Sequence, residues 1–567
     1  MLKYLATLAV LAISATLAAG SARAARDDAP ASATSATRPR LVVVISIDQC
    51  RADYLVRFGD LLLPPGTGKR PGGFRYLQAN GAWYPDCRYE HMKTVTGVGH
   101  SVLGSGAQPT VSGIIGNSWF DRETGKSLYC TDDPKSCVVG ALSGSKKTPM
   151  SAANQMVTTL DDELELATSG QSRTVSISLK DRASILMAGH RADTVLWFDD
   201  GTGGWISSSA YCRNGRLPTW AEELNQEKYS DMLRAKGKWE PSVDDAALAR
   251  TWVLGGASRR FSHPFGETGY GEMTTSPAGN ELLFQAARKA VEAEELGKDA
   301  VPDVLTLNLA SNDYVGHRYG PDSPEVLDIS VQTDLQLSEF LAFLEEKVPG
   351  GLKNVTFAIS ADHGVGTIPE LNAAGNVPAS RAVYAPLVAA AESALDESFG
   401  KEDWIASMEN GEIYFRDTAV ARHPEVPRAR LEERVVEALR NGRGVYFCIG
   451  KSAVLAGNVP RTATGSRITQ GTHPARSGDV IVILQPNWLP GSAPTGSGAS
   501  HGTPFPYDTQ VPLLIAGAGV QPGIYTEPVA PSRLAPSLAF LLGIARPSGA
   551  EGAILPGFQV AGLAAER

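Results

Sequence analysis

Three apolar runs, each leading into an acidic residue, constrain the fold of this chain more than any other feature. They span residues 41–47, 304–309 and 355–360, and they lead to Asp48, Asp313 and Asp362. Runs of this kind are typical of strands that are buried on both faces of a parallel sheet. Because α/β sheets place their ligands at the carboxyl ends of strands, the acids and the histidines that accompany them are predicted to lie in the loops that follow these strands and to belong to a binding site there.

Histidines accompany these acids at spacings that suit metal ions. Asp313 and His317 are four residues apart, and His363 directly follows Asp362 in an Ala-Asp-His-Gly string. Imidazole nitrogen and carboxylate oxygen are suitable ligands for zinc. A lone Asp-His-Gly is more often a turn, and Asp-x-x-x-His alone is a weaker signal still. Two neighbouring ions are favoured because further candidate ligands accompany these fragments, namely Asp48, Thr96 and His501.

The chain is longer than one ordinary domain, so a large core with an additional unit is expected. Ser323-Pro324-Glu325 predicts the start of a helix that ends near residue 348 and covers a sheet. Short strands and one helix before residue 474 indicate a small insertion, after which 479–484 reads as a return to core strands. The expected fold is α/β, with a large, mostly parallel central sheet, helices on both faces and an inserted smaller α+β cap. The predicted divisions are a signal peptide at 1–24, a flexible leader at 25–40, a core at 41–368 with an irregular excursion at about 201–277, a cap at 369–474 and core completion at 475–567.

The N-terminus predicts export to the periplasm or the medium. Lys3 precedes a mostly apolar stretch, and Ala22-Arg23-Ala24 forms a small-x-small cleavage site. No later apolar run reaches the roughly 20 residues that a membrane-crossing helix needs, so no membrane anchor is expected. Loss of Lys3 and Arg23 would change the net charge from −9 to −11. Such a charge disfavours nucleic acid as an obligate partner but permits a local positive pocket for one phosphate. A monomer is expected.

Six cysteines in an exported chain permit disulfides, although the sequence does not show their pairing. Cys130 and Cys137 bracket a polar turn, and a local bond between them is the best single prediction. A thiolate metal site is disfavoured because the chain has no Cys-x-x-Cys spacing.

Three further residues suggest phosphate chemistry. Thr96 lies where a Gly-rich turn leads into a helix, and a metal-bound hydroxyl there would be a nucleophile; the simpler alternative is a capping residue. Lys180 and Arg182 follow a strand predicted at 174–179, and alternation would place both side chains on one side of an extended segment. Their simpler interpretation is a solvated strand end.

Seven strings carry a resemblance that spans most of the chain. In order, they are Ile45-Ser46-Ile47-Asp48, Thr96-Gly97-Val98-Gly99-His100, Gly116-Asn117-Ser118-Trp119-Phe120-Asp121, Lys180-Asp181-Arg182, Asn312-Asp313-Tyr314-Val315-Gly316-His317, Ala361-Asp362-His363-Gly364 and Ser500-His501-Gly502-Thr503. Together they resemble the alkaline phosphatase superfamily, and within it the exported, phosphate-irrepressible bacterial alkaline phosphatases with a threonine nucleophile.

The resemblance implies two zinc ions per chain and a role for each matching residue. One ion would be held by Asp313, His317 and His501, and the other by Asp48, Asp362, His363 and the oxygen of Thr96. It also implies that Asn117 donates to phosphate and that Lys180 and Arg182 contact its non-bridging oxygens. A phosphate monoester carries about two negative charges and a diester one, so this cationic pair favours the monoester.

The expected activity is therefore zinc-dependent hydrolysis of small phosphate monoesters through a phosphothreonine, with release of inorganic phosphate. One alternative is a nucleotide pyrophosphatase/phosphodiesterase, which is similar in fold, zinc ligands and Thr nucleophile but lacks the Lys-x-Arg pair, and secondary phosphodiesterase activity is plausible. Another is a non-catalytic metal or phosphate binder, which would not need Thr96. A sulfatase is disfavoured because the chain has no Cys/Ser-x-Pro-x-Arg string.

Overall fold

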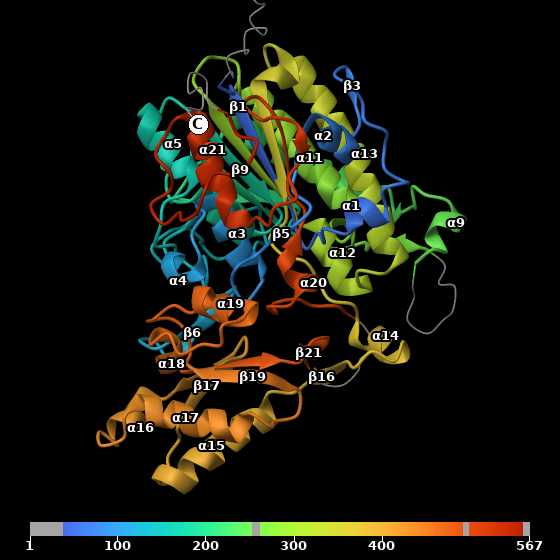
Figure 1. Cartoon of the computed structure of the whole chain (residues 1–567). Coiled ribbons are helices and arrows are strands. Elements are labelled where there is room, and N and C mark those ends of the chain that lie inside the picture. The colour runs from blue at the N-terminus through green and yellow to red at the C-terminus, as the bar shows by residue number, and fades with distance from the viewer. Residues whose placement is uncertain (1–37, 252–260, 492–497, 560–567) are drawn as a thin grey trace, which may run out of the picture. The chain divides into compact units, whose positions relative to one another are not determined.

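The computed structural model describes residues 38–251, 261–491 and 498–559, so the predicted signal peptide and most of the predicted leader lie outside the described residues. Within this part, a central sheet has ten strands (Figure 1). In spatial order they are β24 (Gly523–Ile524), β4 (Gly81–Trp83), β23 (Leu514–Gly517), β15 (Val355–Ser360), β1 (Leu41–Ile47), β14 (Asp303–Leu309), β9 (Thr174–Ser178), β10 (Thr194–Asp199), β11 (Gly204–Ser208) and β8 (Val138–Val139). The five from β15 to β10 are mutually parallel, and antiparallel pairs flank them on both sides.

The three apolar runs of the sequence form the middle of this sheet. Leu41 pairs with Asp303 on one side and with Val355 on the other, and the parallel register continues to Ile47 beside β14 and to Ser46 beside β15. Every residue of these three strands is buried, which explains why the runs lack polar alternation. The parallel register brings the residues that follow β1, β14 and β15 to one edge of the sheet.

Helices cover both faces of the sheet, as the sequence predicted (Figure 1). On one side lie α11 (Pro277–Ala293) and α13 (Pro324–Lys347), and on the other α3 (Thr96–Ser105), α5 (Leu160–Thr168) and α21 (Leu534–Leu542). Helix α6 (Asp181–Ala188) packs against α3. The predicted start of α13 is confirmed: Ser323 precedes Pro324, and its side chain accepts a hydrogen bond from the Val326 amide. Among the described residues, no helix combines the length and the apolar character that crossing a membrane requires.

A second, four-stranded sheet, called the small sheet below, is antiparallel. Its order is β17 (Ile405–Glu409), β18 (Glu412–Phe415), β20 (Val480–Leu484) and β19 (Val445–Gly450), and α15 (Ala385–Phe399) and α17 (Arg428–Leu439) pack with it. The prediction that 479–484 returns to the core is wrong, because β20 lies inside the small sheet. Val480 and Val482 pack into the cluster that includes α17, whereas Ile481 and Ile483 pack into a second cluster with Met92. Both faces of β20 are thus covered, and its sequence resembles that of a core strand.

Two further expectations differ from the structure. The irregular excursion predicted to begin near residue 201 contains β11, a strand of the central sheet, followed by short helices such as α7 (Thr219–Glu227). The expected Cys130–Cys137 bond is wrong, because all six cysteines are free thiols. Cys130 is fully buried in a cluster with Val98, whereas Cys137 is exposed. A polar turn between two cysteines therefore did not show whether both side chains face the same way.

Candidate active site

The candidate site is built at the carboxyl ends of four neighbouring parallel strands. Asp48 follows β1, Lys180 follows β9, and Asp362 and His363 follow β15. After β14 the chain turns into helix α12 (Ser311–Tyr319), not into the loop that the sequence suggested. Asp313 and His317 are one helical turn apart and share a helix face, so their four-residue spacing brings both side chains to the site.

The first candidate ligand group contains Asp313, His317 and His501. His317 Nε2 lies 3.2 Å from Asp313 Oδ1 and 3.2 Å from His501 Nε2. The Nδ1 atoms contact backbone carbonyl oxygens, that of Ala499 at 2.8 Å and that of Thr94 at 2.7 Å. Since a carbonyl only accepts, each Nδ1 must donate, and each ring in its neutral form therefore turns an Nε2 lone pair toward the other. A cation between them would relieve this arrangement.

The second group contains Asp48, Asp362 and His363, all fully buried. His363 Nε2 lies 3.0 Å from Asp362 Oδ2 and 3.7 Å from Asp48 Oδ1. These three atoms are buried and have no hydrogen-bond partner. Because buried polar atoms are normally paired, such a cluster of acceptors fits a bound cation. Both groups offer nitrogen and oxygen ligands of the kind that hold divalent metal ions.

The carboxylates of the site are packed closely enough to perturb one another. Burial, followed by the charge of Asp362, raises the pKa of Asp48 to about 7. Burial opposes the charged form of His363, yet the Asp362 carboxylate raises the pKa of that imidazole to about 9. Burial and the nearby imidazoles hold the pKa of His501 well below its usual range. The site thus concentrates negative charge that only nearby cations can offset.

Lys180 is the protein's own cation at the centre of this arrangement. Its Nζ lies 2.9 Å from Asp48 Oδ2 and 2.6 Å from Asp313 Oδ2, so it bridges the two ligand groups. Burial opposes its charge, but the carboxylates of Asp313 and Asp48 raise the pKa of Lys180 above its ordinary value. The ammonium group is therefore retained although the side chain is only 2% exposed.

Thr96 is the first residue of α3, as expected, and it is 1% exposed. Arg182 Nη2 lies 3.4 Å from its Oγ1, and Asn117 Oδ1 accepts a 2.8 Å hydrogen bond from the Gly97 amide. Asn117 is thus held against the same helix start. The expected alternation of Lys180 and Arg182 on a strand is wrong, because Arg182 lies in the first turn of α6. The helical turn brings Arg182 to Thr96, while Lys180 reaches the ligand groups.

Sequence reasoning missed the residues that support these side chains. Gln49 donates from its backbone to Asp362 and from its side chain to Asp313, with a positive φ of 64°. Asn308 contacts His100 Nε2 at 2.9 Å, while His100 Nδ1 lies 2.8 Å from the Thr96 carbonyl oxygen. Tyr129 accepts a 3.1 Å hydrogen bond from Arg182. Gln49 beside Asp48 and His100 in the Thr96 string carried a local signal, whereas Asn308 and Tyr129 reach the site from distant segments.

Two glycines permit the close approach of these elements. A Cβ at Gly99 would lie 2.1 Å from the carbonyl oxygen of Asp362, so helix α3 can pack against this strand end only without a side chain there. A Cβ at Gly316 would lie 1.9 Å from Gln49 Oε1. The glycines of the Thr96 and Asp313 strings therefore have a packing role beside the candidate ligands.

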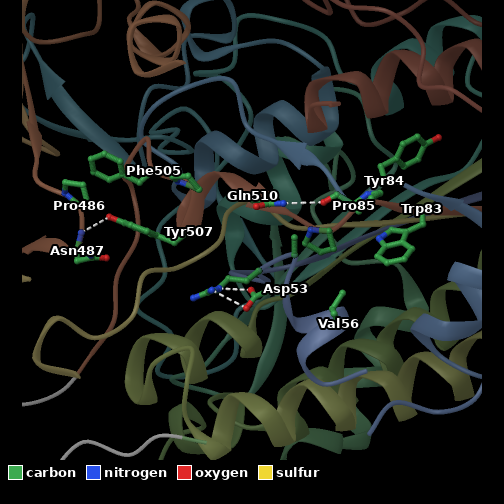
Figure 2. Close-up of a pocket in the computed structure, with 14 residues that line it drawn as sticks. Asp53, Val56, Trp83, Tyr84, Pro85, Pro486, Asn487, Phe505, Tyr507 and Gln510 are labelled. Carbon is green, nitrogen blue, oxygen red and sulfur yellow. Dashed lines mark hydrogen bonds and ion pairs between the residues drawn. The ribbon is translucent and has the colours of Figure 1, made fainter. Parts of the chain in front are cut away.

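A pocket of about 760 Å³ lies near the site and has an aromatic and proline-rich lining (Figure 2). Tyr507 accepts a hydrogen bond from the Asn487 amide, and Arg51 is paired with Asp53. The pocket is lined by none of the ten residues that the sequence assigned to metal or substrate. The guanidinium of Arg51 is neutralised by Asp53, so the residues that line this pocket offer phosphate no free cation.

Comparison with known proteins agrees with the fold. The family described as type I phosphodiesterase / nucleotide pyrophosphatase matches residues 42–504. The chain belongs to this family. It is 34% identical to the alkaline phosphatase PafA of Elizabethkingia meningoseptica, over 91% of this chain and 93% of the relative. It is 32% identical to the alkaline phosphatase PhoV of Synechococcus elongatus, over 91% and 92%.

A solved structure extends this similarity to three dimensions. The crystal structure of wild-type PafA matches with a TM-score of 0.83 and 32% identity, covering 93% of this chain and all of that one. The resemblance to the alkaline phosphatase superfamily is therefore confirmed, as is the large sheet with helices on both faces.

Proposed function

We propose that the protein is a zinc-dependent phosphomonoesterase that transfers the phosphoryl group of its substrate to Thr96 and then to water. The observation that supports this most strongly is the convergence of two candidate ligand groups, the Thr96 hydroxyl and the Arg182 guanidinium at one sheet edge. The relatives named alkaline phosphatases support the same reaction class. A non-catalytic binder would have no use for a buried hydroxyl beside a guanidinium.

Two zinc ions would be held by the two ligand groups, with the Thr96 oxygen completing the second. The unpaired Asp48 Oδ1, Asp362 Oδ2 and His363 Nε2 support this assignment. Bound divalent ions supply positive charge that acidifies coordinated oxygens and stabilises a leaving oxygen. We assign no further metal ligand.

The protein's own residues position the reacting groups. The Thr96 oxygen attacks phosphorus, the bond from phosphorus to the ester oxygen breaks, and the alcohol leaves. Water then cleaves the phosphothreonine, which releases inorganic phosphate and restores the hydroxyl. Arg182 and Asn117 lie at the start of α3, where a guanidinium, a side-chain amide and the helix N-terminus all favour a phosphate dianion. Lys180 adds a second fixed positive charge between the ligand groups.

A solved variant of the relative PafA supports these assignments. Its title names four substitutions, of one threonine, one asparagine, one lysine and one arginine, in that order along its chain. The threonine and asparagine are 21 residues apart, as are Thr96 and Asn117 here, and the lysine and arginine are two apart, as are Lys180 and Arg182. The same residue types therefore recur at the same short spacings.

A phosphodiesterase is the second candidate, because the description of the matching family names that activity. The rates at which the purified protein hydrolyses p-nitrophenyl phosphate, a monoester, and bis(p-nitrophenyl) phosphate, a diester, distinguish the two candidate functions. We expect a higher kcat/KM for the monoester, because two cationic side chains can balance its second charge. A clear preference for the diester would refute the proposed subclass.

We further propose that the protein is exported and acts as a monomer. The N-terminal sequence of the mature protein should begin at Ala25, and sedimentation should give the mass of one chain. An intact N-terminus on the protein recovered from the periplasm or the medium would contradict the proposed cleavage.

A further inference from the structure

A small cavity of about 110 Å³ opens beside the candidate active site and is lined by residues that nothing above assigns to substrate. On one side it is bounded by Val95, Gly116 and His501. Val95 precedes Thr96 and Gly116 precedes Asn117, while His501 belongs to the first ligand group. Of the six side chains in the two ligand groups, only His501 lines the cavity. A substrate whose phosphorus faces Thr96 and whose ester oxygen faces the His501 group would therefore extend its organic part into this space.

The part of the lining that comes from the small sheet and its neighbours includes aliphatic residues and two aromatic ones. Trp488 in β21 (Trp488–Pro490) and Tyr384 belong to it, together with the Asn410 turn between β17 and β18. The indole of Trp488 packs directly on Gly444, where an added Cβ would lie 2.5 Å from the ring. A ring fixed on backbone in this way forms a rigid surface for another ring. Burial raises the pKa of Tyr384 to about 12, so its phenol stays neutral.

The charge of the lining indicates which kind of group fits. Lys93 contributes an ammonium group, but its Nζ lies 2.6 Å from Glu412 Oε1 and is neutralised by that carboxylate. Among the described residues that line the cavity, no uncompensated cation is left to attract a second phosphate of a nucleotide or a sugar bisphosphate. The cavity therefore favours a neutral, apolar organic group.

The size of the cavity limits that group to about one ring. Sites for drug-sized ligands measure about 300–1,000 Å³, whereas an engineered cavity of about 150 Å³ accommodates benzene. A volume of about 110 Å³ matches the smaller case and excludes a fused bicycle or a nucleoside from full burial.

We propose that this cavity is the leaving-group subsite of the enzyme and that it selects phosphate monoesters of alcohols carrying a single apolar ring, with Trp488 and Tyr384 as the specificity-determining contacts. This inference rests on the proposed phosphomonoesterase function and names the substrate class for it.

The test compares kcat/KM for benzyl phosphate, ethyl phosphate and 1-naphthylmethyl phosphate, three esters of primary alcohols with similar intrinsic reactivity. Wild type should prefer benzyl over ethyl phosphate by about tenfold or more, and naphthylmethyl phosphate should gain little over ethyl. Trp488→Ala and Tyr384→Ala should each lower the ratio of benzyl to ethyl by about three- to tenfold. Leu455→Ala, at a residue that is 53% exposed on α18 (Lys451–Leu455), is the matched control and should leave the ratio unchanged.

The possible outcomes separate the two proposals. Equal kcat/KM for benzyl and ethyl phosphate in wild type, or an unchanged ratio in both folded aromatic variants, would overturn the subsite. If neither aromatic variant folds, the three-ester series with wild type decides alone, and a preference that rises through naphthylmethyl phosphate would contradict the size limit. No turnover of any ester by metal-loaded wild type would refute the phosphomonoesterase assignment, and the subsite with it.

Discussion

Lys93 Nζ lies 2.6 Å from Glu412 Oε1, and this ion pair joins the segment before Thr96 to the small sheet. The side chains are 9% and 0% exposed. Lys93 has a positive φ of 59°, and the next residue, Thr94, accepts the hydrogen bond of His501. The pair therefore ties β18 to a short, conformationally restricted segment that leads to the proposed nucleophile.

Loss of this pair should destabilise the protein. Lys93→Met leaves the buried Glu412 carboxylate with only the Tyr414 hydroxyl and the Gly478 amide as partners. We expect the free energy of unfolding to fall by about 3–5 kcal/mol, measured by urea denaturation. Lys147→Met removes the exposed pair with Asp200 and should cost less than about 1 kcal/mol. Equal, small effects of the two substitutions would show that the buried pair does not stabilise the fold.

Arg182 should discriminate between monoesters and diesters. Arg182→Met removes the guanidinium beside Thr96 Oγ1, and we expect kcat/KM for p-nitrophenyl phosphate to fall about 10- to 100-fold. The loss with bis(p-nitrophenyl) phosphate should be smaller, because a diester carries one charge less. Arg250→Met, at an exposed residue paired with Asp60, serves as control and should change neither rate. The same loss with both esters would argue against a charge-selective role.

Metal removal should affect stability as well as activity. Dialysis against a chelator should abolish turnover and lower the thermal unfolding temperature, because Lys180 alone then offsets the charge of the buried carboxylates of both ligand groups. Each ion present at about 1,000 times its dissociation constant would contribute about 4 kcal/mol. Added Zn²⁺ should restore both properties, and metal analysis should give two ions per chain. Full activity after complete removal of metal would contradict the site described here.

The buried Glu165 provides a pH-dependent prediction away from the site. Its carboxylate accepts a hydrogen bond from Thr174 Oγ1, and burial, with the charge of Asp193, raises its pKa from 4.5 to about 7. Between these two values the native state binds a proton that the unfolded state has lost, so stability falls as pH rises through this range.

Glu165→Gln retains the acceptor but cannot ionise. We expect the variant to be more stable than wild type by about 2 kcal/mol at pH 8 and nearly equal to it at pH 4, from urea midpoints at the two values. Equal differences at both pH values would show that ionisation of Glu165 does not cause the effect.

The predictions from sequence were most accurate for features that the central sheet determines. Leu41–Ile47 is buried on both faces, so its composition alone indicated a central strand, and parallel pairing placed the acids after β1, β14 and β15 at one edge. The same rule failed for β20, because helix α17 and the Met92 cluster cover its two faces as completely as helices cover a core strand. Composition reports burial, and it does not identify the sheet to which a buried strand belongs.

Local sequence patterns also gave little information about contacts between distant segments of the chain. Asp313 and His317 were expected on a loop, but they lie on α12. Their spacing is that of adjacent turns of this helix, so the two side chains still meet as predicted. Arg182 reaches Thr96 through the first turn of α6, and Tyr129 supports it from a separate hairpin. Such contacts depend on how helices are placed on the sheet, which no single string encodes.

The covalent role of Thr96 is the central claim, and trapping the intermediate tests it most directly. Enzyme mixed with a phosphate monoester and quenched in acid within the first turnover should carry one phosphoryl group on the peptide that contains Thr96. Thr96→Ala should bind metal, remain folded, carry no phosphoryl group and lose nearly all turnover. A phosphoryl group on another residue, or full turnover by Thr96→Ala, would contradict the assignment.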